Sequence, residues 1–446
     1  MSLTYKTVTT LGDFGPWVSK LVLELPCEVR AAEVSPSAFN VFCARHDRGS
    51  EDVLMRREHG AAAAAPSQGF VEVLSAAPCD EHGEPALRGR HVALEVGEVR
   101  VNKRIEGNVR GARYVENRYR VTQLAPLTGD GDWPVTGLVW DECAGDLCPA
   151  LTGWHEASAA EGSPLPYAWY DPRELPPAAS SPLAKPSVEQ PGARHALIVW
   201  LHGAGEGGLE NGGDVTVAYT GNRVTALSQP HVQALFGGRA WVLVPQSPTF
   251  WMDDGEERLG RSNQSVYARP LMELVERFVS EHADSIDPAR VVIGGLSNGG
   301  FMTLRMCADH PGYFAAGVAV CAPFFRENQT PEVLSALAQT PLWLVHSKGD
   351  ELVDIDDTAL PLYHALHKAG APVHFTCYDH VEDLTGVYRE SDGRPRRFMN
   401  HGVWIHAYND FPATELDGTN VEVRGKPASL WEWAAAQRRD IDSREN

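Results

Sequence analysis

The sequence predicts an α/β domain built on a mainly parallel sheet, preceded by a small all-β domain. From residue 196 onward, short apolar runs alternate with segments of helical spacing, which is the pattern of a parallel sheet with helices on both faces. Before about residue 125, short segments alternate apolar and polar residues, and a helical period is hard to find. This first part is therefore expected to form a β-sandwich. With 446 residues, the chain is long enough for two or three domains.

The elements of the two domains follow from these periods. Strands of the sandwich are expected at residues 17–25, 69–74, 91–96 and 119–124. Strands of the α/β domain are expected at residues 166–170, 196–201, 240–244, 291–293, 317–321, 342–345 and 373–377, and helices at 271–279, 301–308 and 360–367. Residues rich in Pro, Gly, Ala and Ser separate the two parts. The predicted boundaries are 1–125 for the sandwich, 126–160 for a linker and 161–446 for the α/β domain.

The composition excludes several classes of protein. A net charge of −20 would repel nucleic acid and anionic membranes, so neither is expected as a partner. The eight cysteines include no Cys-x-x-Cys pair, and no metal or cofactor is expected. Cys143 and Cys148 are spaced for a disulfide, but reduced cysteines are the simpler interpretation. The chain shows neither the start of a signal peptide nor an apolar run of membrane-spanning length, which favours the cytoplasm.

A candidate nucleophile lies in residues 291–301, where Gly-x-Ser-x-Gly follows an apolar β-branched run and precedes a helix-like segment. A serine at such a strand-to-helix turn exposes its oxygen, and the next backbone N–H points toward an incoming carbonyl. Gly295 and Gly299 let the turn tighten without a Cβ clash. Ser297 is therefore the predicted nucleophile, although a glycine-rich loop with an incidental serine would give the same five-residue pattern.

A serine needs a base, and the base needs a group to orient it. Asp350 is the candidate acid because it comes soonest after the strand at 342–345, and a turn aspartate that binds local N–H groups is the alternative. Its competitors nearby are Asp354, Asp356 and Asp357.

His401 is the candidate base because it follows the last predicted strand and completes the order Ser, Asp, His. Its rivals are His380 and His406. The third part of the expected site is the loop at residues 201–207, whose glycines allow backbone N–H groups to point at an oxyanion. We expect Ala204 and Asn298 to be the donors. Together these groups are what acyl transfer requires.

The motifs resemble, in order, those of α/β-hydrolase esterases related to prolyl oligopeptidases and polyhydroxybutyrate depolymerases. They are His-Gly-Ala-Gly-Glu at 202–206, Val-Pro-Gln-Ser-Pro at 244–248, Gly-Leu-Ser-Asn-Gly-Gly at 295–300, the Gly-Asp turn at 349–350 and His-x-x-Trp-x-x-Ala-Tyr at 401–408. The resemblance covers roughly residues 160 to 440. It implies Ser297 as nucleophile, Asp350 as acid and His401 as base. The β-rich front is similar to the immunoglobulin-like domain of some bacterial carboxylesterases, where such a domain can support oligomerisation.

The sequence departs from that group at two places. Asn400 stands where the group often has Gly, and a polar insert at residues 381–398 precedes His401. The insert is expected to act as a lid or a binding loop.

The expected substrate pocket contains Trp251, Phe324 with its neighbour Phe325, and Trp404, although aromatic residues more often fill a core. The sequence thus predicts a serine carboxylesterase that hydrolyses small or aromatic esters. The alternatives are a serine peptidase or amidase, and an inactive hydrolase that acts as a binding protein. The front is too short for a β-propeller, which disfavours the peptidase.

Overall fold

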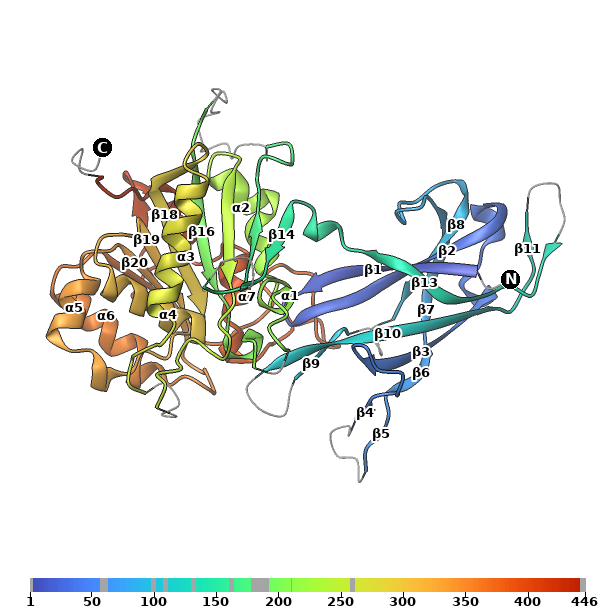
Figure 1. The fold of residues 1–446 in the computed structure, drawn as a ribbon, viewed down its shortest axis with the longest axis horizontal. Coiled ribbons are helices and arrows are strands. Elements are labelled where there is room, and N and C mark those ends of the chain that lie inside the picture. The colour runs from blue at the N-terminus through green and yellow to red at the C-terminus, as the bar shows by residue number, and fades with distance from the viewer. Residues whose placement is uncertain are drawn as a thin grey trace. The chain divides into compact units, whose positions relative to one another are not determined.

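The computed structural model describes residues 3–56, 63–97, 102–106, 111–129, 134–159, 164–177, 192–209, 211–256 and 261–441. The chain folds into two compact units (Figure 1). The first, called the β-domain here, comprises Met1–Gly107, Ala112–Thr152 and Thr220–Arg223. The second, the α/β domain, comprises Asn108–Gly111, Gly153–Tyr219 and Val224–Asn446.

The described part of the β-domain is built from strands, as predicted. Its main sheet has the order β6-β3-β10-β13-β1-β2-β8-β7, and β9 pairs with β10. Only the β1–β13 pair within this sheet is parallel. The bounds are β1 Leu3–Gly12, β2 Gly15–Arg30, β3 Phe39–Asp47, β6 Gln68–Val71, β7 Val73–Cys79, β8 Arg88–Val96, β9 Arg104–Glu106, β10 Ala112–Gln123 and β13 Val139–Leu147. Two short pairs, β4 Met55–Arg56 with β5 Ala65–Pro66 and β11 Leu127–Thr128 with β12 Pro134–Val135, complete it.

The predicted strands lie where the alternation placed them. Leu21 and Leu23 of β2 and Val92 and Leu94 of β8 belong to one buried cluster, because alternate side chains of a strand point to the same face. The segment expected at 69–74 is divided at Glu72 between β6 and β7.

The linker expected at residues 126–160 is wrong, because this range contains strands of both sheets. Strand β13 lies between β10 and β1 inside the sheet, and the fully buried Trp140 donates its Nε1–H to the Glu24 carbonyl at 2.7 Å. Residues 141–146 of this strand are exposed, so the segment lacks the apolar alternation that marks a strand. Strand β14 at the end of the same range pairs into the sheet of the other domain. Residues 130–133 and 160 of the expected linker lie outside the described residues.

The α/β domain has the predicted mainly parallel sheet, in the order β14-β15-β17-β16-β18-β19-β20-β21. The strands from β17 to β21 in this order are parallel, whereas β15 runs antiparallel to both of its neighbours, β17 and β14. The strand expected at 166–170 is therefore present, but β14 lies outside it at the edge. The bounds are β14 Trp154–Ala157, β15 Tyr167–Tyr170, β16 His195–Leu201, β17 Ala240–Pro245, β18 Ile286–Leu296, β19 Ala316–Val320, β20 Leu342–Ser347 and β21 Val373–Tyr378. A short hairpin joins β22 Glu422–Val423 and β23 Lys426–Pro427.

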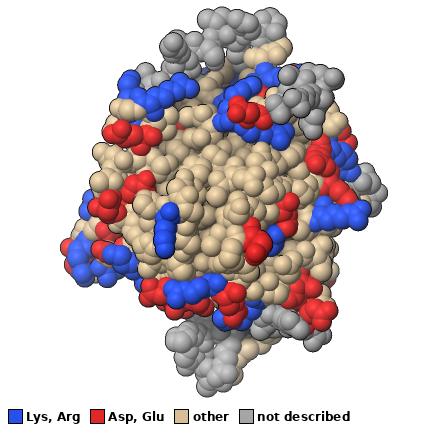
Figure 2. All heavy atoms as spheres, turned by 90° about the vertical axis from the view of Figure 1, so that its left-hand side faces the viewer, with Lys and Arg blue, Asp and Glu red and all other residues tan. Residues whose placement is uncertain are grey.

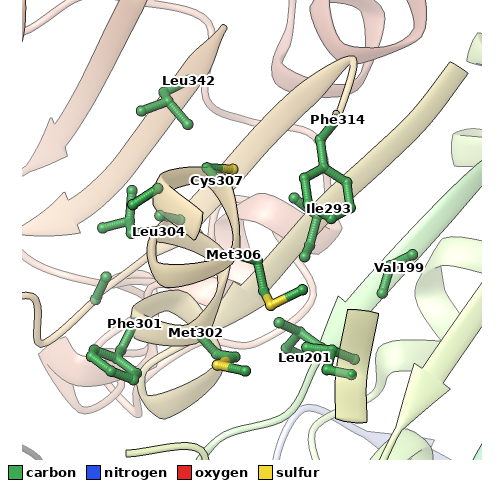
Figure 3. Packing of buried hydrophobic residues seen from close by; sticks show 14 of the residues in the cluster. Val199, Leu201, Ile293, Phe301, Met302, Leu304, Met306, Cys307, Phe314 and Leu342 are labelled. Atoms are coloured by element: carbon green, nitrogen blue, oxygen red, sulfur yellow. The ribbon is translucent and has the colours of Figure 1, made fainter. Parts of the chain in front are cut away.

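Helices cover both faces of this sheet, which its strand residues show directly. Leu197, Val199 and Leu201 of β16 share a buried cluster with α4, and Figure 3 shows Met302 and Met306 of that helix on the side toward Leu201. On the opposite face, Trp200 packs against the rings of Tyr408 in α7 and Trp431 in α8. The helices are α1 Thr216–Thr220, α2 Pro230–Leu235, α3 Ala268–Glu281, α4 Asn298–Asp309, α5 Pro331–Leu337, α6 Ala359–Lys368, α7 Trp404–Tyr408 and α8 Leu430–Ala436.

Surface and cysteine features bear on the compositional expectations. In the view of Figure 2, acidic and basic side chains lie in mixed groups around a largely uncharged area, so the net charge of −20 is not gathered there into one acidic patch. Each of the eight cysteines lies in the described part of the chain and none forms a disulfide, so Cys143 and Cys148 are not bonded to each other. Among the described residues, no helix combines the length and the apolar character that crossing a membrane would need.

Candidate active site

Ser297 lies at the bend between β18 and α4, where the sequence places the nucleophile. Its φ of 51° and ψ of −117° put a non-glycine residue in a strained conformation, which raises the side chain out of the turn. A Cβ on Gly295 would lie 2.6 Å from the Gly299 carbonyl carbon, and one on Gly299 only 2.0 Å from the Leu201 oxygen. The two glycines are therefore required by the close approach of α4 to the end of β16.

The three residues predicted as nucleophile, base and acid form one chain of hydrogen bonds. The Ser297 hydroxyl lies 2.9 Å from His401 Nε2. On the other side of the ring, Nδ1 lies 2.8 Å from Asp350 Oδ2 and 3.0 Å from Oδ1. The ring is thus held between an alcohol that can give up a proton and a carboxylate that can orient it.

The rival residues have other partners. Asp354 caps the short helix Ile355–Asp357 by accepting the N–H of Asp356. His380 contacts the Glu382 carboxylate at 3.1 Å, and His406 bonds the Glu382 carbonyl at 2.9 Å. The tertiary structure therefore brings Asp350 and His401 to Ser297.

Asp350 is held as a carboxylate by its surroundings. Its side chain is 0% exposed, and its Oδ1 accepts the N–H groups of Leu352 and Val353, both at 2.9 Å. Burial acts to raise its pKa, but the hydrogen bond and charge of His401 and the two N–H groups together lower the pKa of Asp350 below its usual value. Oδ1 therefore binds local backbone N–H groups, as the alternative of a turn aspartate expected, and the same carboxylate also contacts His401.

Glu351 is a residue of the site that sequence reasoning missed. One carboxylate oxygen accepts the Asn400 N–H at 3.3 Å and its side-chain Nδ2–H at 3.2 Å, and the other accepts the His401 N–H at 3.3 Å. Asn400 in turn accepts the Val381 N–H at 3.0 Å, which explains an asparagine where the resembled group often has glycine. The only signal in the sequence is the adjacency of Glu351 to Asp350.

The polar insert at 381–398 leaves the strand end and returns to it. The Phe398 N–H bonds the Val381 carbonyl at 3.0 Å, and the Asp383 N–H bonds the Arg396 carbonyl at 2.8 Å. Asp383 accepts the N–H of Tyr388 at 2.9 Å inside the excursion. The two ends of the insert are therefore tied together by backbone hydrogen bonds just before His401.

The expected oxyanion donors begin two helical segments. Ala204 is the first residue of the short helix Ala204–Glu206, and Asn298 is the first residue of α4. The first N–H groups of a helix have no partner within it, so both are suited to binding negative charge. A Cβ on Gly203 would lie 2.7 Å from Leu296 Cδ1, which shows that the loop lies directly against the nucleophile strand.

The aromatic residues expected in the substrate pocket lie in different surroundings in the structure. Trp251 and Phe324 are 0% and 1% exposed and belong to the hydrophobic core, so their side chains fill the interior. Trp404 is 5% exposed and lies edge-on to the His401 ring with centroids 5.8 Å apart. Phe325 is half-buried, with the Arg261 guanidinium 4.4 Å from its ring centroid. Spacing along the chain could not separate these cases because all four residues follow strand ends or turns.

Two further features are present at this edge of the sheet. Cys321 lies beside the acid and base, and its metal-binding atom and those of Asp350 and His401 are within 4.8 Å of one another. Burial raises the pKa of the Cys321 thiol well above its usual value, and Asp350 and His401 already bond each other, so the group fits proton transfer better than metal binding. A cavity of about 720 Å³ is lined by residues including Glu156, Asp214 and Pro248, and by none of the three hydrogen-bonded residues.

Comparisons with known proteins agree with this architecture. Residues 183–386 match the phospholipase/carboxylesterase family model, and residues 4–133 match that of the esterase Ig-like N-terminal domain. Poly(3-hydroxyalkanoate) depolymerase C of Paucimonas lemoignei is 28% identical over 136 residues. That match covers 29% of this chain and 28% of the depolymerase, so the chain spans under a third of its length.

A crystal structure of a thermostable esterase has a TM-score of 0.68 and 20% sequence identity, covering 98% of this chain and 100% of the other. At this identity the likeness shows the shared fold. The chain therefore carries a phospholipase/carboxylesterase family domain over residues 183–386 and an esterase-type immunoglobulin-like domain over residues 4–133, and its second unit has the α/β-hydrolase fold.

Proposed function

We propose that the protein is a serine carboxylesterase that hydrolyses small or aromatic esters through an acyl-enzyme on Ser297. The observation that carries the proposal is the continuous chain of hydrogen bonds from Ser297 through His401 to Asp350. A serine alcohol is a weak nucleophile at neutral pH, and this arrangement supplies the base and the buried carboxylate that activate it.

The reaction follows from the positions of the atoms. His401 Nε2 takes the Ser297 proton while Oγ attacks the ester carbonyl, and the N–H groups of Ala204 and Asn298 bind the oxyanion that develops. The imidazolium then gives its proton to the departing alcohol, which leaves the acyl group on Oγ. Water repeats the sequence and releases the acid. Each oxyanion donor contributes about 3 kcal/mol to the transition state in enzymes of this kind.

The substrate class is supported by one aromatic side chain. The Trp404 ring makes a T-shaped contact with the His401 ring, and an aromatic side chain this close to the proposed base favours a compact apolar or aromatic substrate group over a charged one. No cofactor or metal takes part in this mechanism, and the substrate is a small-molecule ester.

The test uses a short nitrophenyl ester and a matched variant. Wild-type protein should hydrolyse the ester and be labelled by a fluorophosphonate probe, whereas Ser297→Ala should lose both properties. Turnover that survives Ser297→Ala would overturn the proposal. A higher kcat/KM for a chromogenic peptide than for the ester would favour the peptidase or amidase, and a wild-type protein that resists the probe would favour an inactive binding protein.

A further inference from the structure

A short segment after β17 contacts both loops that carry the expected oxyanion donors. This segment, Ser247–Trp251, is called the brace segment here. It lies in the part of the chain where the sequence showed only a family motif and an aromatic residue. Three contacts tie it to the rest of the site.

The first contact is with the loop of Ala204. The Ser247 N–H donates to His202 Nε2 at 3.0 Å, and the Ser247 carbonyl accepts the Gly208 N–H at 2.8 Å. His202 Nδ1–H donates to the Gly203 carbonyl at 2.7 Å. Burial lowers the pKa of His202 to about 4, so the ring is neutral and its Nε2 is free to accept.

The second contact is with the nucleophile turn. The Trp251 N–H donates to the side-chain oxygen of Asn298, the residue whose own N–H is the other expected donor. Trp251 is buried, and its ring packs on the His202 ring with centroids 5.1 Å apart. Trp251 of the brace segment therefore contacts both His202, which belongs to the loop of Ala204, and Asn298 of the nucleophile turn.

The third contact is a close backbone approach. A Cβ on Gly207 would lie 1.8 Å from the Thr249 carbonyl oxygen, so the loop after Ala204 lies directly on the middle of the brace segment. Because both ends and the middle of the brace segment contact the loop of Ala204 or the turn of Asn298, the segment can hold these two elements at a fixed separation.

We propose that the brace segment sets the distance between the N–H groups of Ala204 and Asn298, and that His202 and the Asn298 side chain are positioning residues for the oxyanion hole. The inference rests on the proposed esterase function. Oxyanion donors act only when they lie 2.7–3.1 Å from the developing charge, and a displacement of about 1 Å lowers the rate by roughly 100-fold. A segment that contacts the elements of both donors can keep the two N–H groups at the required distance.

The experiment removes the two acceptors separately. His202→Leu and Asn298→Ala should each lower kcat on a nitrophenyl ester by roughly 10- to 100-fold with KM changed less than about twofold, because the loss falls on the transition state. The inhibition constant of a trifluoromethyl ketone, which forms an oxyanion on serine, should rise by the same factor. His202→Gln keeps an acceptor and should recover most of kcat. The double variant should lose less than the product of the two single losses, because both disturb one support.

Gln233→Leu is the matched control. Gln233 is a buried amide that accepts the Ala240 N–H at 2.7 Å at the start of β17, at the opposite end of that strand from the site. It should lower the thermal midpoint without changing kcat.

The outcomes separate the two claims. Wild-type turnover that survives Ser297→Ala would overturn the esterase function and this inference together. Turnover that depends on Ser297, combined with unchanged kcat in His202→Leu and Asn298→Ala, would overturn only the brace. If His202→Leu does not fold, Asn298→Ala decides alone, since it removes one acceptor and leaves the core intact.

Discussion

The exchange Asp350→Asn removes the negative charge beside His401 while keeping the size of the side chain. Asp350 Oδ1 accepts two backbone N–H groups, from Leu352 and Val353, which only an oxygen can accept. The amide oxygen of the variant must therefore occupy that position, and the amide N–H₂ replaces Oδ2 opposite His401 Nδ1. An N–H facing Nδ1 forces the ring to carry its proton on Nε2, where it can no longer accept the proton of Ser297.

The magnitude follows from the burial of the pair. The side chains of His401 and Asp350 are 6% and 0% exposed, so their interaction is little screened by water. With charge centres about 4 Å apart and an effective dielectric constant of about 20, the carboxylate stabilises the imidazolium by about 4 kcal/mol. This corresponds to a loss of about 10³ in kcat, to which the wrong tautomer adds.

Steady-state hydrolysis of a nitrophenyl ester measures this loss, with KM expected to change little. The control is Asp354→Asn, which alters an aspartate of the same loop that caps a backbone N–H without touching His401. It should retain the wild-type kcat. An Asp350→Asn variant that folds and keeps more than a tenth of kcat would refute the assignment of Asp350 as the orienting acid.

Three further predictions concern the support of the site and its stability. Glu351→Ala should lower kcat roughly tenfold, because the turn that carries His401 loses its acceptors, and Glu351→Gln should lose less. Gly299→Ala should destabilise the fold by more than about 3 kcal/mol in thermal or urea unfolding, since its Cβ would overlap the Leu201 oxygen. Burial raises the pKa of Asp410 to about 7, so the folded state retains a proton that the unfolded state releases above about pH 4. The stability from this group therefore falls by up to about 4 kcal/mol as pH rises from 4 to 7, and Asp410→Asn should flatten the curve of unfolding free energy against pH.

Each of these predictions has a contradicting result. Equal kcat for Glu351→Ala and wild type would mean that the turn holds His401 without the carboxylate. A Gly299→Ala protein with the wild-type midpoint would mean that α4 can move away from β16 freely. Parallel pH curves for Asp410→Asn and wild type would place the ionisation of Asp410 below pH 4 in the folded state.

Much of the fold could be predicted because its signals are local. The buried strands β16 and β17 are continuous apolar runs, and the helix α3 has helical spacing. Strand β13 could not be found in this way, because six of its residues are exposed and only its pairing with β1 and β10 makes it a strand. The same limit applied to the pocket, where the exposure of Trp251 and Phe324 depends on what packs over them.

By itself, the sequence determined the strand-to-helix bend at Ser297, the order of the three hydrogen-bonded residues and the division into an all-β and an α/β part. Those features depend on residues that are close in the sequence, namely glycines where a Cβ has no room and apolar side chains at a fixed period. Only the tertiary structure decided that Asp350 rather than Asp354 meets His401, that Glu351 binds the turn of His401, and that the segment Ser247–Trp251 contacts both His202 and Asn298. Those contacts join residues about fifty or more positions apart, or they depend on the exact backbone path between such residues. The local periodicity of a sequence carries no information on these two features.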